Sequence, residues 1–302
     1  MNRFRNLVLP VAIVLGLIFH SYCGILRVCV PYLIFTILLL NFVATDIKKL
    51  RFSLFDALLM AIQVSLSLGI YLILRLLGVD EIVSQGVLVG VLCPVAASVV
   101  VISCMLGANR ETVTAYTIFD NLLVALLAPL VFSFVGEHQD MPFGESFLLI
   151  VRRVAPIIAL PFFAAWLLQT FLPKANAFLV RYRGLSFYLW AVALFITLGQ
   201  TIDFIFLRGE ENLSSIIVLG VVSVMFCIFQ FGVGKLIGHR FGDTIAGGQL
   251  LGQKNSALGI WMANTYLNPL SAVFPALYSV WQNLFNSWQL WRHDNRKSKI
   301  EN

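Results

Sequence analysis

The sequence predicts an all-α integral membrane protein with ten transmembrane helices. Three observations lead to this prediction: the composition, the number of long apolar runs, and the uneven placement of basic residues. Of the 302 residues, 59% are hydrophobic and only 12% are charged, whereas a soluble domain has roughly 45–50% and about 25%. This composition excludes a water-soluble fold.

Ten apolar runs bounded by polar residues are long enough to cross a bilayer, which needs about 20 residues per helix. The runs of the first half are 7–22, 26–43, 55–77, 82–106 and 112–134, and those of the second half are 147–172, 185–207, 213–237, 244–266 and 269–291. An acidic segment, 137–145, separates the halves. The first run lacks the small-residue cleavage site of a signal peptide, so we interpret it as a span.

Basic residues test the topology, because Lys and Arg in short loops mark the cytoplasmic side. With the N-terminus inside, the inner loops and tails hold most of the 21 Lys and Arg residues. Acidic residues gather in the outer loops, including Asp80, Glu81, Glu210 and Glu211. We therefore expect both termini to be cytoplasmic, in the cell (inner) membrane. This arrangement also explains the net charge of +6 without a nucleic-acid partner.

Motifs for enzyme chemistry are missing from the sequence. The five cysteines include no C-x-x-C pair, the four histidines are far apart, and there is no P-loop or nucleophile elbow. We expect no catalytic residue, no metal site and no cofactor, and thus no enzyme.

Two spans, one in each half, carry helix-weakening residues near their middle. In the span 82–106, Gly86 and Gly90 precede Pro94; in the span 244–266, Gly248 and Gly252 precede a polar run. Close helix packing alone accounts for the glycine pairs equally well. Interrupted helices in two halves of five spans, however, are typical of inverted repeats, here residues 1–140 and 141–302. Their helix N-termini near mid-membrane favour an anionic solute.

At these residues the chain resembles the bile acid:sodium symporter family. The likeness rests on Cys93-Pro94 with the small residues after it, on the run Gly252-Gln253-Lys254-Asn255-Ser256, and on residues 276–283 of the last span. It implies a core of spans 3–5 and 8–10, in which the two broken helices cross, beside a panel of spans 1, 2, 6 and 7. It also implies alternating-access transport of a small organic anion with sodium.

The sodium ligands of that family are largely missing here. A Ser-Asn pair after the first break is replaced by Val99 and Val100, and a hydroxyl of the next span by Val113, which leaves Thr117. A carboxylate is replaced by Leu250 and a glutamine by Lys254. Because sodium needs several oxygen donors, we expect altered or lost sodium coupling.

Lys254 lies about 15 Å from either end of its span at about 1.5 Å per residue, too deep for its side chain to reach the interface. Asp120 lies at a similar depth, three residues after Thr117 on the same helix face, and is the expected partner of a buried ion pair. We hypothesise that the Lys254 ammonium replaces a sodium ion, either as a fixed charge or as a group that exchanges a proton during transport. The sequence does not choose between these two.

The predicted sites fall into three groups. Solute contacts are Ser98, Asn255, Ser256, Gln282 and Asn283; ion-site positions are Gln63, Thr117, Asp120, Gln253 and Lys254; the helix breaks are Pro94 and Gly252. The polar residues Ser98, Gln253 and Ser256 serve equally well as local helix caps. The expected partners are a small organic anion and the lipid bilayer. The alternative function is a membrane solute sensor that binds without transporting; the solute, the transport direction and the oligomeric state stay open.

Overall fold

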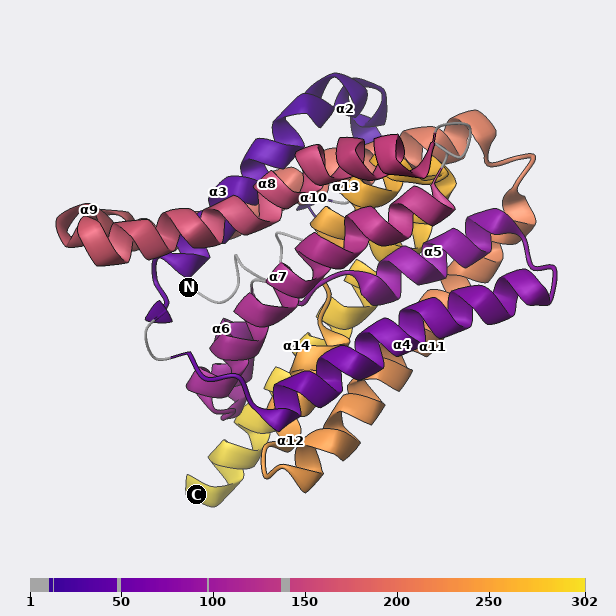
Figure 1. Cartoon of the computed structure of the whole chain (residues 1–302). Helices are drawn as coiled ribbons and strands as arrows, with labels where there is room; N and C mark the ends of the chain where they lie inside the picture. Colours follow the sequence, from indigo (N-terminus) through magenta and orange to yellow (C-terminus); the bar gives the residue numbers. More distant parts are fainter. Residues whose placement is uncertain (1–10, 13, 48–49, 97, 137–141, 302) are drawn as a thin grey trace.

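The computed structural model describes residues 11–12, 14–47, 50–96, 98–136 and 142–301, and this part of the chain is helical with no strands (Figure 1). Six of its helices are long and apolar enough to cross a membrane. They are His20–Phe42, Leu54–Leu76 (α4), Arg110–Val135 (α7), Phe143–Phe171 (α8), Leu185–Arg208 (α10) and Leu213–Arg240 (α11). The fold is thus all-α with six candidate spans, and the count of ten stays a prediction.

The first helical region differs from the prediction. A helical run continues from α2 (His20–Leu26) through a 3-10 turn, η1 (Arg27–Cys29), into α3 (Val30–Phe42). The predicted break after Tyr22 is therefore wrong: the chain bends at Phe19, whose φ of −110° and ψ of 19° leave helical geometry. The start of the predicted span 7–22 lies outside the described residues.

The two spans with weakened middles are both interrupted. The first divides into α5 (Glu81–Leu92) and α6 (Val99–Leu106), and the second into α12 (Thr244–Gly252) and α13 (Ser256–Tyr266). The last predicted span begins with a 3-10 turn, η3 (Pro269–Ala272), and continues as α14 (Val273–Glu301). A short helix that we did not predict, α9 (Pro173–Val180), follows α8.

The helices form two groups, which α7 joins by packing against α8 and α13 joins by packing against α10. In one, α3 packs against α8 and α10, and α2 packs against α10. In the other, α11 packs against α5, α12 and α14, and α4 packs against α5. The predicted glycine pair Gly86 and Gly90 does serve close packing, since a Cβ at either position would overlap Leu219 or Phe274.

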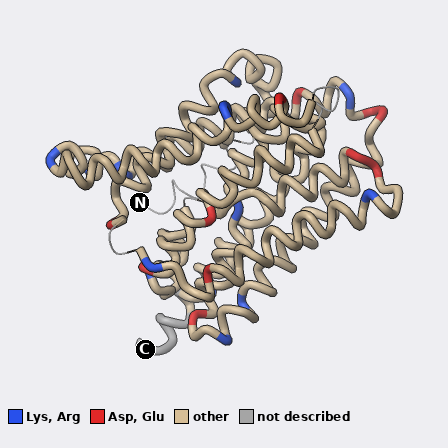
Figure 2. The backbone as a smooth tube through the Cα atoms, in the orientation of Figure 1, with Lys and Arg blue, Asp and Glu red and all other residues tan. Residues whose placement is uncertain are grey.

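Charged residues gather toward the ends of the long helices, while the middle of the bundle is mostly uncharged (Figure 2). Among the described residues, the buried charged side chains are those of Asp56, Asp120 and Lys254. Asp56 caps α4, because its carboxylate accepts hydrogen bonds from the backbone and hydroxyl of Ser53. Asp120 and Lys254 lie instead near the helix interruptions.

Candidate functional site

The two helix interruptions meet, and we call the contact of residues 93–96 with residues 253–255 the crossing. Val95 and Lys254 form an isolated antiparallel β-bridge there. The amide of Asn255 donates to the carbonyl of Pro94 at 2.8 Å, and the amide of Ala96 donates to the carbonyl of Gln253 at 3.3 Å. Each interruption thereby supplies partners for backbone groups of the other, which a membrane interior would otherwise leave unsatisfied.

A chain of buried polar side chains beside the crossing joins Lys254 to Asp120 through Gln63. The Nζ of Lys254 donates to the Oε1 of Gln63 at 2.7 Å, and the Nε2 of Gln63 donates to Asp120 at 2.9 Å. These side chains are 2%, 0% and 0% exposed, respectively. In the part of the chain that the structure describes, Lys254 and Asp120 do not form the direct ion pair that we predicted. The amide of Gln63 lies between them. Electrostatic attraction still acts across that amide.

Asp120 and Gln63 also hold the first interruption in place. The second carboxylate oxygen of Asp120 accepts from the amide of Val95 at 2.6 Å, and Gln63 donates to the carbonyl of Leu92 at 3.2 Å. The carboxylate thus satisfies one of the N–H groups that the interruption at Pro94 frees. Structural and electrostatic roles coincide in Asp120.

The second interruption is held by α14. The amide oxygen of Gln282 accepts from the Lys254 N–H at 2.7 Å, and its amide nitrogen donates to the Lys254 carbonyl at 3.0 Å and to Ser256 at 3.2 Å. The Asn255 side chain caps α13 by accepting from the amide of Leu258 at 3.3 Å. Two predicted solute contacts, Gln282 and Asn255, therefore also support the backbone.

Of four other predicted residues, three make local contacts and the fourth, Ser98, caps no helix. Thr117 donates to Val113 at 2.7 Å and Asn283 to Ser279 at 2.7 Å, both within their own helices. Gln253 donates to the side chain of Gln249. Ser98 is exposed at the start of α6 and caps no backbone group with its side chain. None of these contacts reaches the Lys254 ammonium, and the functional roles of the four stay predictions.

Sequence reasoning missed three contacts around the crossing and beyond it. The Cys93 thiol donates to the carbonyl of Asn255 at 2.9 Å, and the Tyr278 hydroxyl donates to the carbonyl of Gly252 at 2.8 Å. Tyr278 lies four residues before Gln282, so helical spacing was the available signal. Between α2 and α10, His20 and Asp203 approach to 2.8 Å, a pairing that no local pattern announces.

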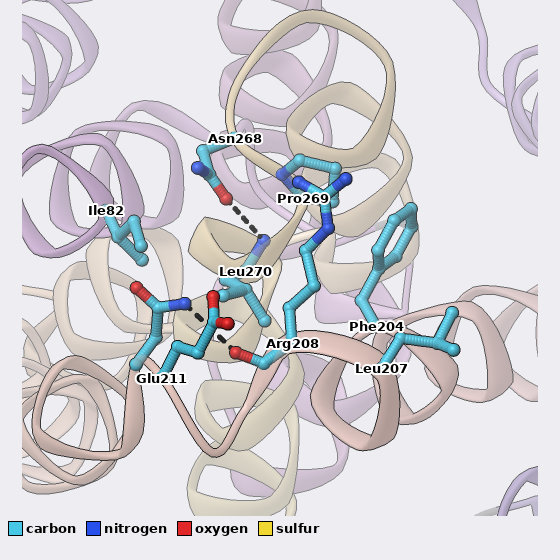
Figure 3. Close-up of a pocket in the computed structure, with 9 residues that line it drawn as sticks. Ile82, Phe204, Leu207, Arg208, Glu211, Asn268, Pro269 and Leu270 are labelled. Atoms are coloured by element: carbon cyan, nitrogen blue, oxygen red, sulfur yellow. Dashed lines mark hydrogen bonds between the residues drawn. The ribbon is translucent and has the colours of Figure 1, made fainter.

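A pocket of about 350 Å³ lies away from the predicted site, beside the turn between α10 and α11 (Figure 3). Its wall includes Arg208 and Glu211 from that turn, Ile82 near the start of α5, and Asn268 with Pro269 before α14. The side chain of Asn268 accepts from the amide of Leu270 at 3.0 Å and caps η3, the turn before α14. The pocket contains none of the predicted site residues.

The chain is similar to a protein of Bacillus subtilis (strain 168) described as an uncharacterized sodium-dependent transporter, YocS. The two are 26% identical over 216 residues, which cover 68% of this chain and 62% of that protein. The similarity thus spans less than two thirds of the relative's length. No protein-family model matches the chain.

The six apolar helices and this similarity together indicate an integral membrane protein, and the relative's description is that of a transporter rather than an enzyme. The bile acid:sodium symporter family stays a prediction from the residues quoted above.

Proposed function

We propose that the chain is a secondary transporter of a small organic anion, built like the bile acid:sodium symporters as two inverted five-helix repeats. The observation that carries the proposal is the crossing. Two interrupted helices from different halves of the chain exchange backbone hydrogen bonds at their interruptions, and interrupted helices near mid-membrane form the solute site of many transporters with inverted repeats. The transport description of the similar protein supports the same class.

The crossing favours an anion. Helices α6 and α13 begin just after the residues of the crossing, so the positive end of each helix dipole lies near the crossing. Lys254 adds a positive charge at the same place, which Asp120 offsets in part through Gln63. These features support solute contact by Ser98, Asn255, Ser256 and Asn283, with Gln282 holding the backbone of the second interruption.

In this proposal Lys254 takes the place of a sodium ion. Two unit positive charges about 4 Å apart repel by roughly 4 kcal/mol at an effective dielectric constant of 20, which weakens sodium binding about a thousandfold. The ammonium is held by Gln63, whose other end contacts Asp120. The fixed-charge and proton-exchange forms of the hypothesis both use this chain of contacts.

Alternating access would move the two sets of helices against each other. The set containing α2, α3, α8 and α10 would form the panel, and the set containing α4 to α7 and α11 to α14 the core. The proposal also places both termini in the cytoplasm and the chain in the cell (inner) membrane, because of the placement of Lys and Arg.

The proposal is tested by uptake of labelled organic anions into proteoliposomes, beside equilibrium binding of the same anions to the purified protein. A transporter accumulates or exchanges a solute that it binds. Binding without flux in sealed vesicles would contradict transport and favour the sensor, which the loss of sodium ligands at Val99, Val113 and Leu250 also fits.

A further inference from the structure

A stripe of polar side chains runs along one face of α14, from the crossing toward the far end of the helix. It comprises Tyr278, Gln282, Asn286, Gln289 and His293. The spacing of four, four, three and four residues places all five within an arc of about 80° around the helix axis. We call this set the polar stripe.

The polar stripe faces the protein, while the opposite side of α14 is exposed and carries large apolar side chains together with Ser287. Tyr278, Gln282 and Asn286 are buried and Gln289 and His293 are partly buried. Leu284 and Trp288, on the opposite side, are 58% and 45% exposed. The polar residues of the stripe therefore do not face the lipid, and their polarity needs another explanation.

The first members of the stripe join the crossing. Tyr278 and Gln282 bind the backbone of the second interruption, and Asn286 accepts from the side chain of Gln249 at 3.1 Å. Gln249 in turn contacts Gln253, which belongs to the crossing. The stripe is thus continuous with the proposed solute site.

Beyond Asn286 the stripe carries polar atoms without protein partners. The Nδ2 of Asn286, the Nε2 of Gln289 and the Nε2 of His293 are buried and have no hydrogen-bond partner among the described residues. Helix packing alone does not account for this pattern, because a buried polar group without a partner costs about 1–3 kcal/mol. Three such atoms on one helix face indicate groups that meet water or solute.

The far end of the stripe is basic. The Nζ of Lys235 lies 5.0 Å from the ring centre of Phe285, and the guanidinium of Arg292 lies 5.4 Å from the ring centre of Trp288. The acidic residue at the start of α12, Asp243, is engaged by backbone amides of Asn109 and Ala246.

We propose that the polar stripe lines a hydrated passage for an anionic group, between the crossing and the basic end of α14. The inference rests on the proposed transport function for what moves along the passage. Amide donors offer hydrogen bonds to carboxylate or sulfonate oxygens, and the two cations raise the local concentration of anions. The apolar side of α14 faces lipid and stays dry.

The test is thiol labelling in membranes open to reagent from both sides. Gln289→Cys and Asn286→Cys are compared with Leu284→Cys, which lies on the exposed side of α14, and labelling of the native five cysteines is subtracted. Because thiolate forms poorly in an apolar environment, we expect cysteine at 289 to react at least about tenfold faster than cysteine at 284. Gln289→Cys keeps the test open if Asn286→Cys does not fold, since the Nε2 that it removes has no partner.

Two charged methanethiosulfonates, one carrying a sulfonate and one a trimethylammonium group, test the anion preference. Their rates at 289 are divided by their rates with a small free thiol. The passage predicts that this ratio is higher for the anionic reagent. Equal labelling of stripe and control positions would overturn the passage, and a higher ratio for the cationic reagent would overturn its assignment to anions. Labelling requires no transport, so failure of the proposed function shows separately, as absence of uptake.

Discussion

The two interruptions of the crossing satisfy their freed backbone groups in different ways. At the first, the carboxyl group of Asp120 on α7 and the amide of Gln63 on α4 bind Val95 and Leu92. At the second, a neutral side chain of α14, Gln282, binds both the N–H and the carbonyl of Lys254. The first interruption is held by a charged side chain of a neighbouring helix, Asp120 of α7, whereas the second contains a charged residue itself, Lys254.

The two interruptions therefore depend on each other electrostatically. The negative charge that holds the first also balances the positive charge within the second, through Gln63.

Asp120→Asn should have the largest effect. It leaves the Lys254 ammonium buried without a compensating charge, and breaking a buried charge pair in this way costs about 3–5 kcal/mol of unfolding free energy. Thermal unfolding in detergent measures the loss. The double variant Asp120→Asn with Lys254→Gln should recover much of the stability, because no charge is then stranded. Equal stability of Asp120→Asn and the native protein would contradict the dependence.

Gln63→Leu should cost about 1.5–3 kcal/mol, the range for hydrogen bonds to charged groups, because both Lys254 and Asp120 lose a partner. The matched control lies one turn along α4: Ser67→Ala removes a neutral bond to the carbonyl of Leu88, worth about 1 kcal/mol. The same unfolding assay compares them. A smaller loss for Gln63→Leu than for Ser67→Ala would show that the amide does not connect the charges.

Gln282→Leu tests the second interruption alone. It leaves the N–H and the carbonyl of Lys254 without their side-chain partners, a loss of about 1–3 kcal/mol. Since no charge is stranded, the loss should stay below that of Asp120→Asn in the same assay. A greater loss would mean that the neutral clamp, not the charge balance, holds the crossing together.

Thr117→Val should have the smallest effect. The hydroxyl donates to Val113 within the same helix, so its removal should change stability by less than about 1 kcal/mol. Uptake should also be unchanged, because the hydroxyl makes no contact with the chain from Lys254 to Asp120. A marked fall in uptake with normal stability would restore Thr117 as an ion or solute ligand.

The sequence predicted the two helix interruptions, which depend on local residues, and failed where the packing of distant helices decides a contact. Pro94, Gly252 and the flanking glycines predicted both interruptions. The helical rise per residue predicted similar depths for Lys254 and Asp120. The bridging position of Gln63 depends on how α4 packs beside α7, which periodicity does not fix. The contact of His20 with Asp203 likewise joins residues far apart in the sequence.

The central claim, that an ammonium stands in for sodium, is tested most directly by uptake of organic anions into proteoliposomes with and without a sodium gradient. The native protein is compared with Lys254→Ala and with the control Lys174→Ala, which removes an exposed lysine of α9, away from the crossing and the polar stripe. We predict native uptake that is indifferent to sodium, that collapses in Lys254→Ala, and that persists in Lys174→Ala. Uptake driven by the sodium gradient in the native protein would contradict the claim and place sodium ligands elsewhere in the chain.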